Sequence, residues 1–135
     1  MIVLDTDVLS ALRRPERAPQ VAAWLRAQDE AALRLSAVTV GEVARGVERA
    51  RRRDPAFAEA LARWLDETAT VFADRVLPFG AAEARIWGRL SARIGHDGAD
   101  LMIAATALAQ GAAVATGNAR HYAPTGVALV DPFAG

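Results

Sequence analysis

Met1-Ile2-Val3-Leu4-Asp5-Thr6-Asp7 opens the chain with an apolar run that stops abruptly at acidic residues. Ile2–Leu4 is short, rich in β-branched residues and followed by polar ones, which predicts a buried strand. The run has no polar face, as is typical of parallel sheets that helices cover on both sides. In such sheets the functional groups gather at the carboxyl ends of the strands, and Asp5 stands at that position.

Four further apolar runs have the same character. They predict strands at Leu33–Val38, Val76–Phe79, Ala113–Thr116 and Val127–Val130. Pro78 lies inside the second of these runs and indicates an edge or interrupted strand, because proline cannot donate a ladder hydrogen bond.

The segments between the strands have helical periodicity or helix-capping residues. They predict helices from Thr6 or Asp7 to about Leu12, over Gln20–Gln28, from a Thr39 cap to Arg49–Arg53, from Asp54-Pro55 to Phe72, and over Ala81–Ile94 and Ala99–Gln110. The last helix is apolar almost all round, which indicates that it is buried. Aromatic residues at helical spacing are expected in the core: Phe57, Trp64, Phe72 and Trp87. Strands that alternate with helices predict an α/β three-layer fold with a central parallel sheet.

The composition narrows the classes of function. The length of 135 residues fits one domain, which we expect to span residues 1–135. Cys is absent, so thiolate metal sites and cysteine nucleophiles are excluded. The 16 basic residues, all of them Arg, cancel the 16 acidic ones, which argues against a strongly basic nucleic-acid binder. No signal-peptide core and no apolar run of roughly 20 residues is present, so we expect a cytoplasmic protein that does not span a membrane.

Four residues near the predicted strand ends can carry chemistry. Asp5 follows the first strand, and Glu42 lies early in the helix after the second. Asp100 opens the buried helix, and Asn118 follows the fourth strand. Crowded carboxylates repel one another unless a cation lies between them, and Mg²⁺ and Mn²⁺ prefer oxygen ligands. Such an ion activates water and neutralises phosphate charge, as phosphodiester hydrolysis requires.

Each acid also has a purely structural interpretation. Thr39 and Glu42 have the spacing of a capping box, so Glu42 can simply close a helix end. Asp5 or Asp7 can cap the first short helix. Asp100 is the least ordinary of the acids, because an acid at the start of a buried helix is costly unless it is paired.

Several segments together resemble the motifs of PIN-domain proteins of the VapC toxin family. They are Ile2–Ser10, Ser36–Val43, Ala99–Ala107 and Val114–Tyr122, and Gly126–Phe133 resembles the closing strand of the family. Each motif is weak alone, but all of them occur in order over nearly the whole chain. The fourth departs from the family pattern, because Gly117 stands where Arg is usual and His121 where an acid is often found. At the place of Asp7, Asn is commoner.

The resemblance implies a PIN fold, with about five parallel strands between helices, and an Mg²⁺- or Mn²⁺-dependent ribonuclease. The acids of the family correspond to Asp5, Glu42 and Asp100, which are expected to hold the metal. Asn118 is expected to be the fourth catalytic residue. On this hypothesis metal-activated water attacks the phosphorus and leaves a 5′-phosphate and a 3′-hydroxyl.

The residue that completes the metal site stays open at this point. The candidates are Asn118, His121, Asp7 and Asp97. Thr6 and Thr116 are expected to support the ligands. Arg45 follows Glu42 by three residues, hence lies on the same helix face, and is expected to steer RNA.

The resemblance also implies partners. Toxins of this family cleave RNA and are held inactive by a small VapB-type antitoxin, whose Arg- or Lys-bearing tail enters the acidic cleft. They commonly form homodimers. The sequence leaves open which RNA is cleaved.

Two other functions compete with this interpretation. A PIN-like module without activity, acting only as a binding scaffold, is one alternative, because the fourth motif is altered. A phosphatase of the haloacid dehalogenase type is another, because Asp5-Thr6-Asp7 is a DxD motif. That chemistry uses a Lys, which the chain lacks. Metal-dependent cleavage of RNA distinguishes an active nuclease from a scaffold.

Overall fold

Five short strands form the centre of the molecule in the computed structural model, which describes residues 1–134. They are β1 (Ile2–Leu4), β2 (Leu33–Ser36), β3 (Val76–Leu77), β4 (Ala113–Ala115) and β5 (Leu129–Val130). Their order across the sheet is β3-β2-β1-β4-β5, and all four pairings are parallel. The predicted parallel sheet of about five strands is therefore confirmed, with β3 at an edge, as Pro78 indicated.

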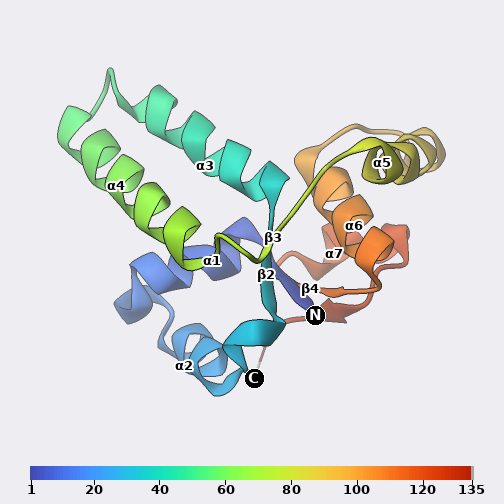
Figure 1. The fold of residues 1–135 in the computed structure, drawn as a ribbon, viewed down its shortest axis with the longest axis horizontal. Helices are drawn as coiled ribbons and strands as arrows, with labels where there is room; N and C mark the ends of the chain where they lie inside the picture. The colour runs from blue at the N-terminus through green and yellow to red at the C-terminus, as the bar shows by residue number, and fades with distance from the viewer. Residues whose placement is uncertain (135) are drawn as a thin grey trace.

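The helices connect these strands in sequence (Figure 1). They are α1 (Thr6–Arg13), α2 (Pro19–Ala27), α3 (Ala37–Ala50), α4 (Pro55–Val71), α5 (Ala81–Ile94), α6 (Ala99–Gln110) and α7 (Ala119–Tyr122). Short 3-10 turns lie at Pro15–Arg17, Glu30–Ala32 and Ala123–Thr125. The predicted bounds of α5 and α6 are confirmed residue for residue. The sequence did not predict α7, whose single turn is too short to show a period.

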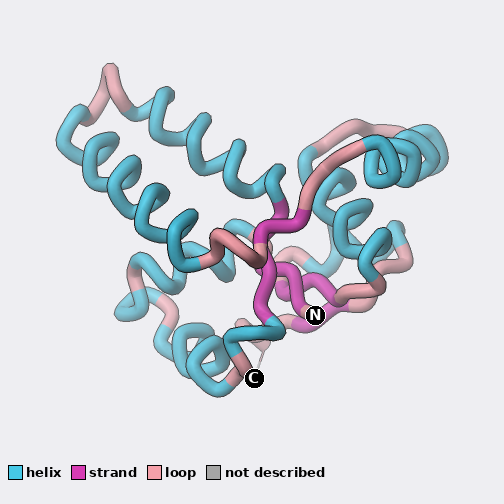
Figure 2. Tube along the Cα trace, viewed as in Figure 1, coloured by secondary structure: helices cyan, strands magenta, loops and turns pink. Residues whose placement is uncertain are grey.

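The sheet separates two apolar cores. Val3 and Val114 belong to the core shared with α5 and α6, whereas Leu4 and Ala115 belong to the core shared with α1 and α2. Successive residues of a strand point to opposite faces, so each strand must be apolar on both sides. Figure 2 shows the strands lying between the two groups of helices. The predicted three-layer arrangement is confirmed.

α3 and α4 lie side by side and project from the sheet as a hairpin (Figure 1). The C-terminal end of α4 reaches the sheet, where Phe72 is buried. Trp64 and Trp87 are half-buried at the margins of the two cores. Phe57, in the first turn of α4, is exposed, and the Arg13 guanidinium lies 5.3 Å from its ring centre. The prediction of a core position was wrong for Phe57, because the hairpin extends beyond the part of the sheet that would cover it.

The start of α3 also differs from the prediction. β2 ends at Ser36, whose hydroxyl accepts a hydrogen bond from the Val38 N–H at 3.1 Å and caps α3. Thr39 lies inside the first turn of the helix and is fully buried. The predicted Thr39 cap and its capping box with Glu42 are therefore wrong, because the helix starts earlier at an equally suitable cap. Among residues 1–134, no helix is long and apolar enough to cross a membrane.

Candidate active site

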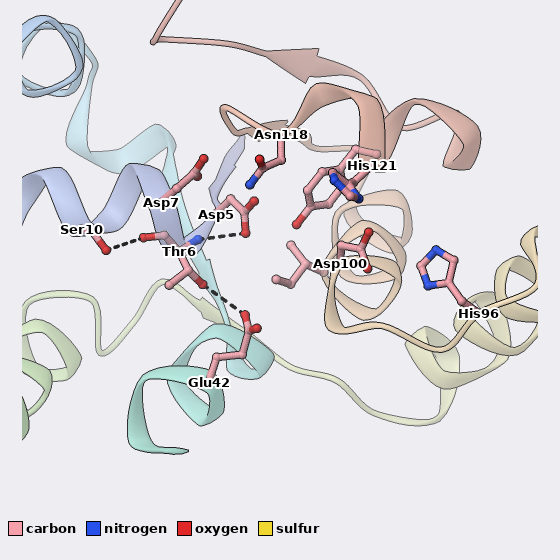
Figure 3. Close-up of a pocket in the computed structure, with 11 residues that line it drawn as sticks. Asp5, Thr6, Asp7, Ser10, Glu42, His96, Asp100, Asn118 and His121 are labelled. Atoms are coloured by element: carbon pink, nitrogen blue, oxygen red, sulfur yellow. Dashed lines mark hydrogen bonds between the residues drawn. The ribbon is translucent and has the colours of Figure 1, made fainter. Parts of the chain in front are cut away.

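A cavity of about 560 Å³ opens at the carboxyl edge of the sheet, and we call it the acidic pocket. Asp5, Glu42, Asp100 and Asn118 all line it. They come from the β1–α1 junction, α3, α6 and the start of α7. In the view of Figure 3, Asp5 lies in the middle of the group, with the other three around it. The four residues selected from the sequence thus come together in one cavity, although they are far apart in the chain.

Asp5 is the most firmly held of these residues. Its side chain is buried, with 8% of the residue exposed. Oδ1 accepts a hydrogen bond from the Thr6 N–H at 2.9 Å and caps α1, while Oδ2 accepts one from Thr116 Oγ1 at 2.7 Å. The Asp5 N–H donates to the Ala115 carbonyl at 3.0 Å. Asp5 therefore caps a helix and faces the pocket at the same time.

Glu42 faces the pocket from the second turn of α3. Its Oε1 accepts a hydrogen bond from Thr6 Oγ1 at 3.1 Å, which connects α3 to the end of β1 (Figure 3). The carboxylate therefore points toward Asp5 and away from the end of its own helix. Thr6, expected as a supporting residue, makes this contact to Glu42 with its hydroxyl, while its backbone N–H donates to the Asp5 carboxylate.

Asp100 lies in the first turn of α6 and is half-buried. Leu101 and residues 103–107 of the helix are buried, as predicted, so the helix brings Asp100 to the pocket rim. Ile103, one turn later, lines the pocket beside it. The negative charge of Asp100 also lies at a helix N-terminus, where it is favourable.

The fourth motif, which follows β4 in the chain, forms one side of the pocket. Asn118 and His121 are both exposed and both line the cavity. Thr116 Oγ1 accepts a hydrogen bond from the Asn118 N–H at 2.9 Å while it donates to Asp5, so Thr116 supports both residues. Gly117 donates its N–H to Asp7 Oδ2 at 2.8 Å. Two hydrogen bonds to carboxylates therefore join this segment to the first motif, in addition to the backbone bond between Asp5 and Ala115.

Asp7 lines the pocket but uses its carboxylate in backbone contacts. Oδ1 accepts from the Val8 N–H at 2.8 Å, and Oδ2 accepts from Gly117. Burial raises the pKa of Asp7, and the negative charge of Asp5 raises it further, against the lowering effect of the two backbone hydrogen bonds. The raised pKa therefore reflects mainly the burial of the Asp7 carboxylate, with repulsion by Asp5 as a smaller contribution.

Tyr122 lines the pocket from α7 but was not predicted as a site residue. It is 1% exposed, and its hydroxyl makes no hydrogen bond of ordinary geometry among residues 1–134. Burial raises its pKa well above the ordinary range, and the charge of Asp5, a hydrogen-bonding interaction with Asp5, and the charges of Asp100 and Glu42 add to the effect. In the sequence, Tyr122 is only an aromatic residue at the end of the fourth motif, and nothing there shows where its hydroxyl points.

Two sequence-derived candidates lie outside the pocket. Asp97 is exposed and lines a different hollow, and Arg45 lines neither. Ser10 and His96 do line the acidic pocket but were not predicted. An arginine cluster was also missed: Arg13, Arg14 and Arg17 line a cavity that shares Asp7 and Ser10 with the acidic pocket. Partial burial lowers the pKa of Arg13, and the charges of its two arginine neighbours lower it further.

The donor set of the pocket fits a hard divalent cation. Carboxylate and amide oxygens line it, and none of the four ion pairs found within residues 1–134 involves a pocket acid. Its negative charge is therefore not offset by Arg. Over the same residues, no three Asp, Glu or His side chains stand close enough together to hold an ion by themselves. The acids thus surround a cavity without forming a closed ligand cluster.

The similarity of this chain to known proteins is consistent with this arrangement. The PIN-domain model matches residues 2–126. The VapC ribonuclease Y4jK of Sinorhizobium fredii is 37% identical, with 98% of each chain covered, and toxin FitB of Neisseria gonorrhoeae is 33% identical over 98% of this chain and 99% of its own. The crystal structure of FitAcB from N. gonorrhoeae superposes with a TM-score of 0.85 at 33% identity, covering 99% of both chains. The chain belongs to the PIN-domain family, in the branch of the VapC-type toxins.

Proposed function

We propose that this protein is the toxin of a type II toxin–antitoxin pair and acts as an Mg²⁺- or Mn²⁺-dependent endoribonuclease. One observation carries the proposal: Asp5, Glu42, Asp100 and Asn118 converge from four segments on one cavity whose acids have no basic partner. The relatives named above, a VapC ribonuclease and the toxin FitB, support the same class of activity.

Asp5, Glu42 and Asp100 would hold the ion through carboxylate oxygens, and Asn118 would offer an amide oxygen. When bound, such an ion supplies a water nucleophile at neutral pH and offsets the charge that builds on the phosphate during hydrolysis. Thr116 and Thr6 fix the acids in advance, because their hydroxyls donate to Asp5 Oδ2 and Glu42 Oε1. Oriented ligands need not reorganise on binding, which favours both affinity and catalysis.

The arginine cluster offers a path for the RNA backbone. Arg13, Arg14 and Arg17 line the cavity next to the acidic pocket, and their charges are close enough to affect one another. Phosphate groups bound there would relieve the repulsion between the arginines. Because such binding neutralises phosphate charges, the affinity for RNA is expected to fall as the salt concentration rises. We therefore propose that one side of the substrate lies over this cluster while the scissile phosphate lies in the acidic pocket.

We further propose a VapB-type antitoxin as partner, a homodimer as the assembly and the cytoplasm, where RNA substrates are abundant, as the site of action. Solved complexes named FitAcB and FitAB support a small antitoxin partner, and the FitAB complex is bound to a DNA fragment. Residues 1–135 are proposed to act as one nuclease domain, because segments from both halves of the chain line the same pocket.

Cleavage of RNA by the purified protein tests the function directly. Total RNA is incubated with Mg²⁺ or Mn²⁺, with EDTA, and with Asp100→Ala as the matched inactive variant. We expect cleavage only by the wild type with metal, and 5′-phosphate ends on the products. Cleavage that persists in EDTA or in a folded Asp100→Ala variant contradicts the mechanism.

Growth and phosphatase assays separate the alternatives. Expression of the wild type alone is expected to arrest growth, whereas Asp5→Ala or Asp100→Ala at equal protein level relieves the arrest. A binding scaffold would give no metal-dependent cleavage in the RNA assay. A phosphatase would hydrolyse p-nitrophenyl phosphate in the presence of Mg²⁺ and leave RNA intact.

A further inference from the structure

Three buried side-chain atoms within residues 1–134 have no hydrogen-bond partner: Thr39 Oγ1, Trp87 Nε1 and the Tyr122 hydroxyl oxygen. Only Tyr122 lines the acidic pocket. A buried donor without a partner is unfavourable, and Phe at the same place would avoid that cost while filling the same volume. The hydroxyl is therefore the feature of this side chain that packing does not explain.

The ring of Tyr122 is held in the core beside the pocket. Its ring belongs to the core shared with α5 and α6 and is 1% exposed. Its carbonyl accepts a hydrogen bond from Thr125 Oγ1 at 2.6 Å, which fixes the backbone after α7. The hydroxyl consequently stays on the pocket side of the core, and its partner must come from the pocket.

Asp5 is the acceptor best placed to become that partner. Among the pocket acids, the charge of Asp5 acts most strongly on the Tyr122 hydroxyl, and a hydrogen-bonding interaction with Asp5 also contributes to the raised pKa of Tyr122. The two groups therefore already face each other, although they do not reach the geometry of an ordinary hydrogen bond. A carboxylate has about four lone-pair sites. Asp5 uses one on each oxygen, for the Thr6 N–H and for Thr116 Oγ1, so sites remain for a cation and for one more donor. Glu42 already receives the Thr6 hydroxyl, and Asp100 is only half-buried and open to water.

We propose that Tyr122 is a positioning residue, whose hydroxyl donates a hydrogen bond to the Asp5 carboxylate when a divalent cation binds in the acidic pocket. The inference rests on the proposed metal-dependent function. Cation binding draws the Asp5 oxygens toward the ion, and a third donor would hold the carboxylate in that orientation. Removing a hydrogen-bond partner of a metal ligand typically weakens metal binding about 10–100-fold.

Tyr122→Phe and Thr39→Val form a matched pair of variants for the test. Each removes a buried hydroxyl that makes no hydrogen bond of ordinary geometry within residues 1–134, and only the first hydroxyl faces the pocket. Both variants should be as stable as the wild type without metal, or more stable. Calorimetric titration with Mg²⁺ should then show an affinity about 10–100-fold weaker for Tyr122→Phe and unchanged for Thr39→Val.

The single tyrosine of the chain provides a second measurement that does not depend on activity. Protein labelled with ¹³C at the tyrosine ring carbon that bears the hydroxyl gives one NMR signal. That signal should move when Mg²⁺ is added to the wild type and stay in place in Asp5→Ala. Because it uses the wild-type side chain, this experiment decides the question even if Tyr122→Phe fails to fold.

The outcomes are distinct. Equal Mg²⁺ affinity of Tyr122→Phe and wild type, with a tyrosine signal that does not move, overturns the inference and makes Tyr122 a core residue only. A similar loss of affinity in Thr39→Val also overturns it, because the effect would then be a general one. RNA cleavage by the wild type, measured in parallel, shows whether the proposed function stands when the inference fails. A wild type that neither binds Mg²⁺ nor cleaves RNA defeats both.

Discussion

The backbone N–H of Gly117 donates to Asp7 Oδ2 at 2.8 Å and so joins the fourth motif of the chain to the first. A Cβ atom at position 117 would lie 2.9 Å from the same Oδ2 and 2.8 Å from Cδ2 of Phe133. Both distances are shorter than ordinary contacts. The absence of the usual Arg at this position therefore has a local steric reason, because no side chain fits there while Asp7 and Phe133 keep their places.

Gly117→Ala should consequently destabilise the protein by roughly 1–3 kcal/mol, the usual cost of overpacking. Phe133→Ala removes one of the two close contacts, so it should restore part of that loss in the double variant. Gly88→Ala is the matched control, since its added Cβ has nothing within 4 Å and lies in α5, where Ala is favoured by roughly 0.5–1 kcal/mol. Urea unfolding of the four variants measures the differences. Equal effects at Gly117 and Gly88 would contradict the steric explanation.

Asp7→Asn should change the pH dependence of the stability of the metal-free protein, although its single amide oxygen can accept only one of the two backbone hydrogen bonds. The pKa of Asp7 is raised in the folded state, so the folded protein binds the Asp7 proton more tightly than the unfolded chain does. Ionising Asp7 therefore lowers the free energy of unfolding above the raised pKa, and this loss disappears as the pH falls below about 4.

Thermal melts of wild type and Asp7→Asn across pH 3–8 measure this effect. The melting temperature of the variant relative to the wild type should rise by a few degrees between acid and neutral pH, on the scale of about 2–8 °C per kcal/mol. A difference that grows as the pH falls would mean that the carboxylate stabilises the fold through its two backbone contacts.

Asp100→Asn should separate metal binding from helix capping. The variant should be at least as stable as the wild type without metal, because Asn keeps the size of the side chain and removes a charge from the acidic pocket. Wild type at 100 times its dissociation constant for Mn²⁺ gains about 2.7 kcal/mol, and Asp100→Asn should lose most of this gain. Asp97→Asn, three residues away and outside the pocket, is the control and should respond to Mn²⁺ like the wild type. An equal metal response of all three proteins would remove Asp100 from the ligand set.

Mn²⁺ titrations of three variants should identify the group after β4 that contacts the ion. Asn118 and His121 both line the pocket, but hard cations prefer oxygen. We therefore expect Asn118→Asp to tighten binding, Asn118→Ala to weaken it and His121→Ala to leave it unchanged. Loss of affinity in His121→Ala alone would assign the role to the imidazole, and no change in any variant would place this segment outside the ligands.

The sequence predicted the elements whose pattern is local and repeated. Ala81–Ile94 has a regular apolar face, Ala99–Gln110 is apolar almost all round, and a glycine follows the last residue of each, so their bounds could be read directly. Ser36 and Thr39 are both suitable caps, and the choice between them depends on where β2 stops pairing with β3, which is a tertiary property. Phe57 was wrongly assigned to the core for a similar reason, since its exposure depends on how far the α3–α4 hairpin extends.

The position of a candidate site residue could be predicted where it follows from the topology of the sheet. Asp5 and Asn118 follow neighbouring parallel strands, so a parallel sheet brings them to one edge whatever the details of packing. Glu42 could be placed near them, but its contact with Thr6 depends on side-chain orientation. The Tyr122 hydroxyl and the arginine cluster were not predictable, because spacing along the chain does not show which cavity a side chain faces.

The central place of β1 in the sheet also has a consequence during synthesis. β1 emerges first from the ribosome, yet its neighbour β4 and the hydroxyl that holds Asp5 lie more than a hundred residues later, with Thr116 separated from Asp5 by 111 positions. Translation at roughly 5–20 residues per second takes several seconds to cover that distance. A growing chain therefore exposes an incomplete pocket for most of its synthesis. The acidic pocket, and any activity that depends on it, can therefore appear only after β4 and Thr116 have been synthesised.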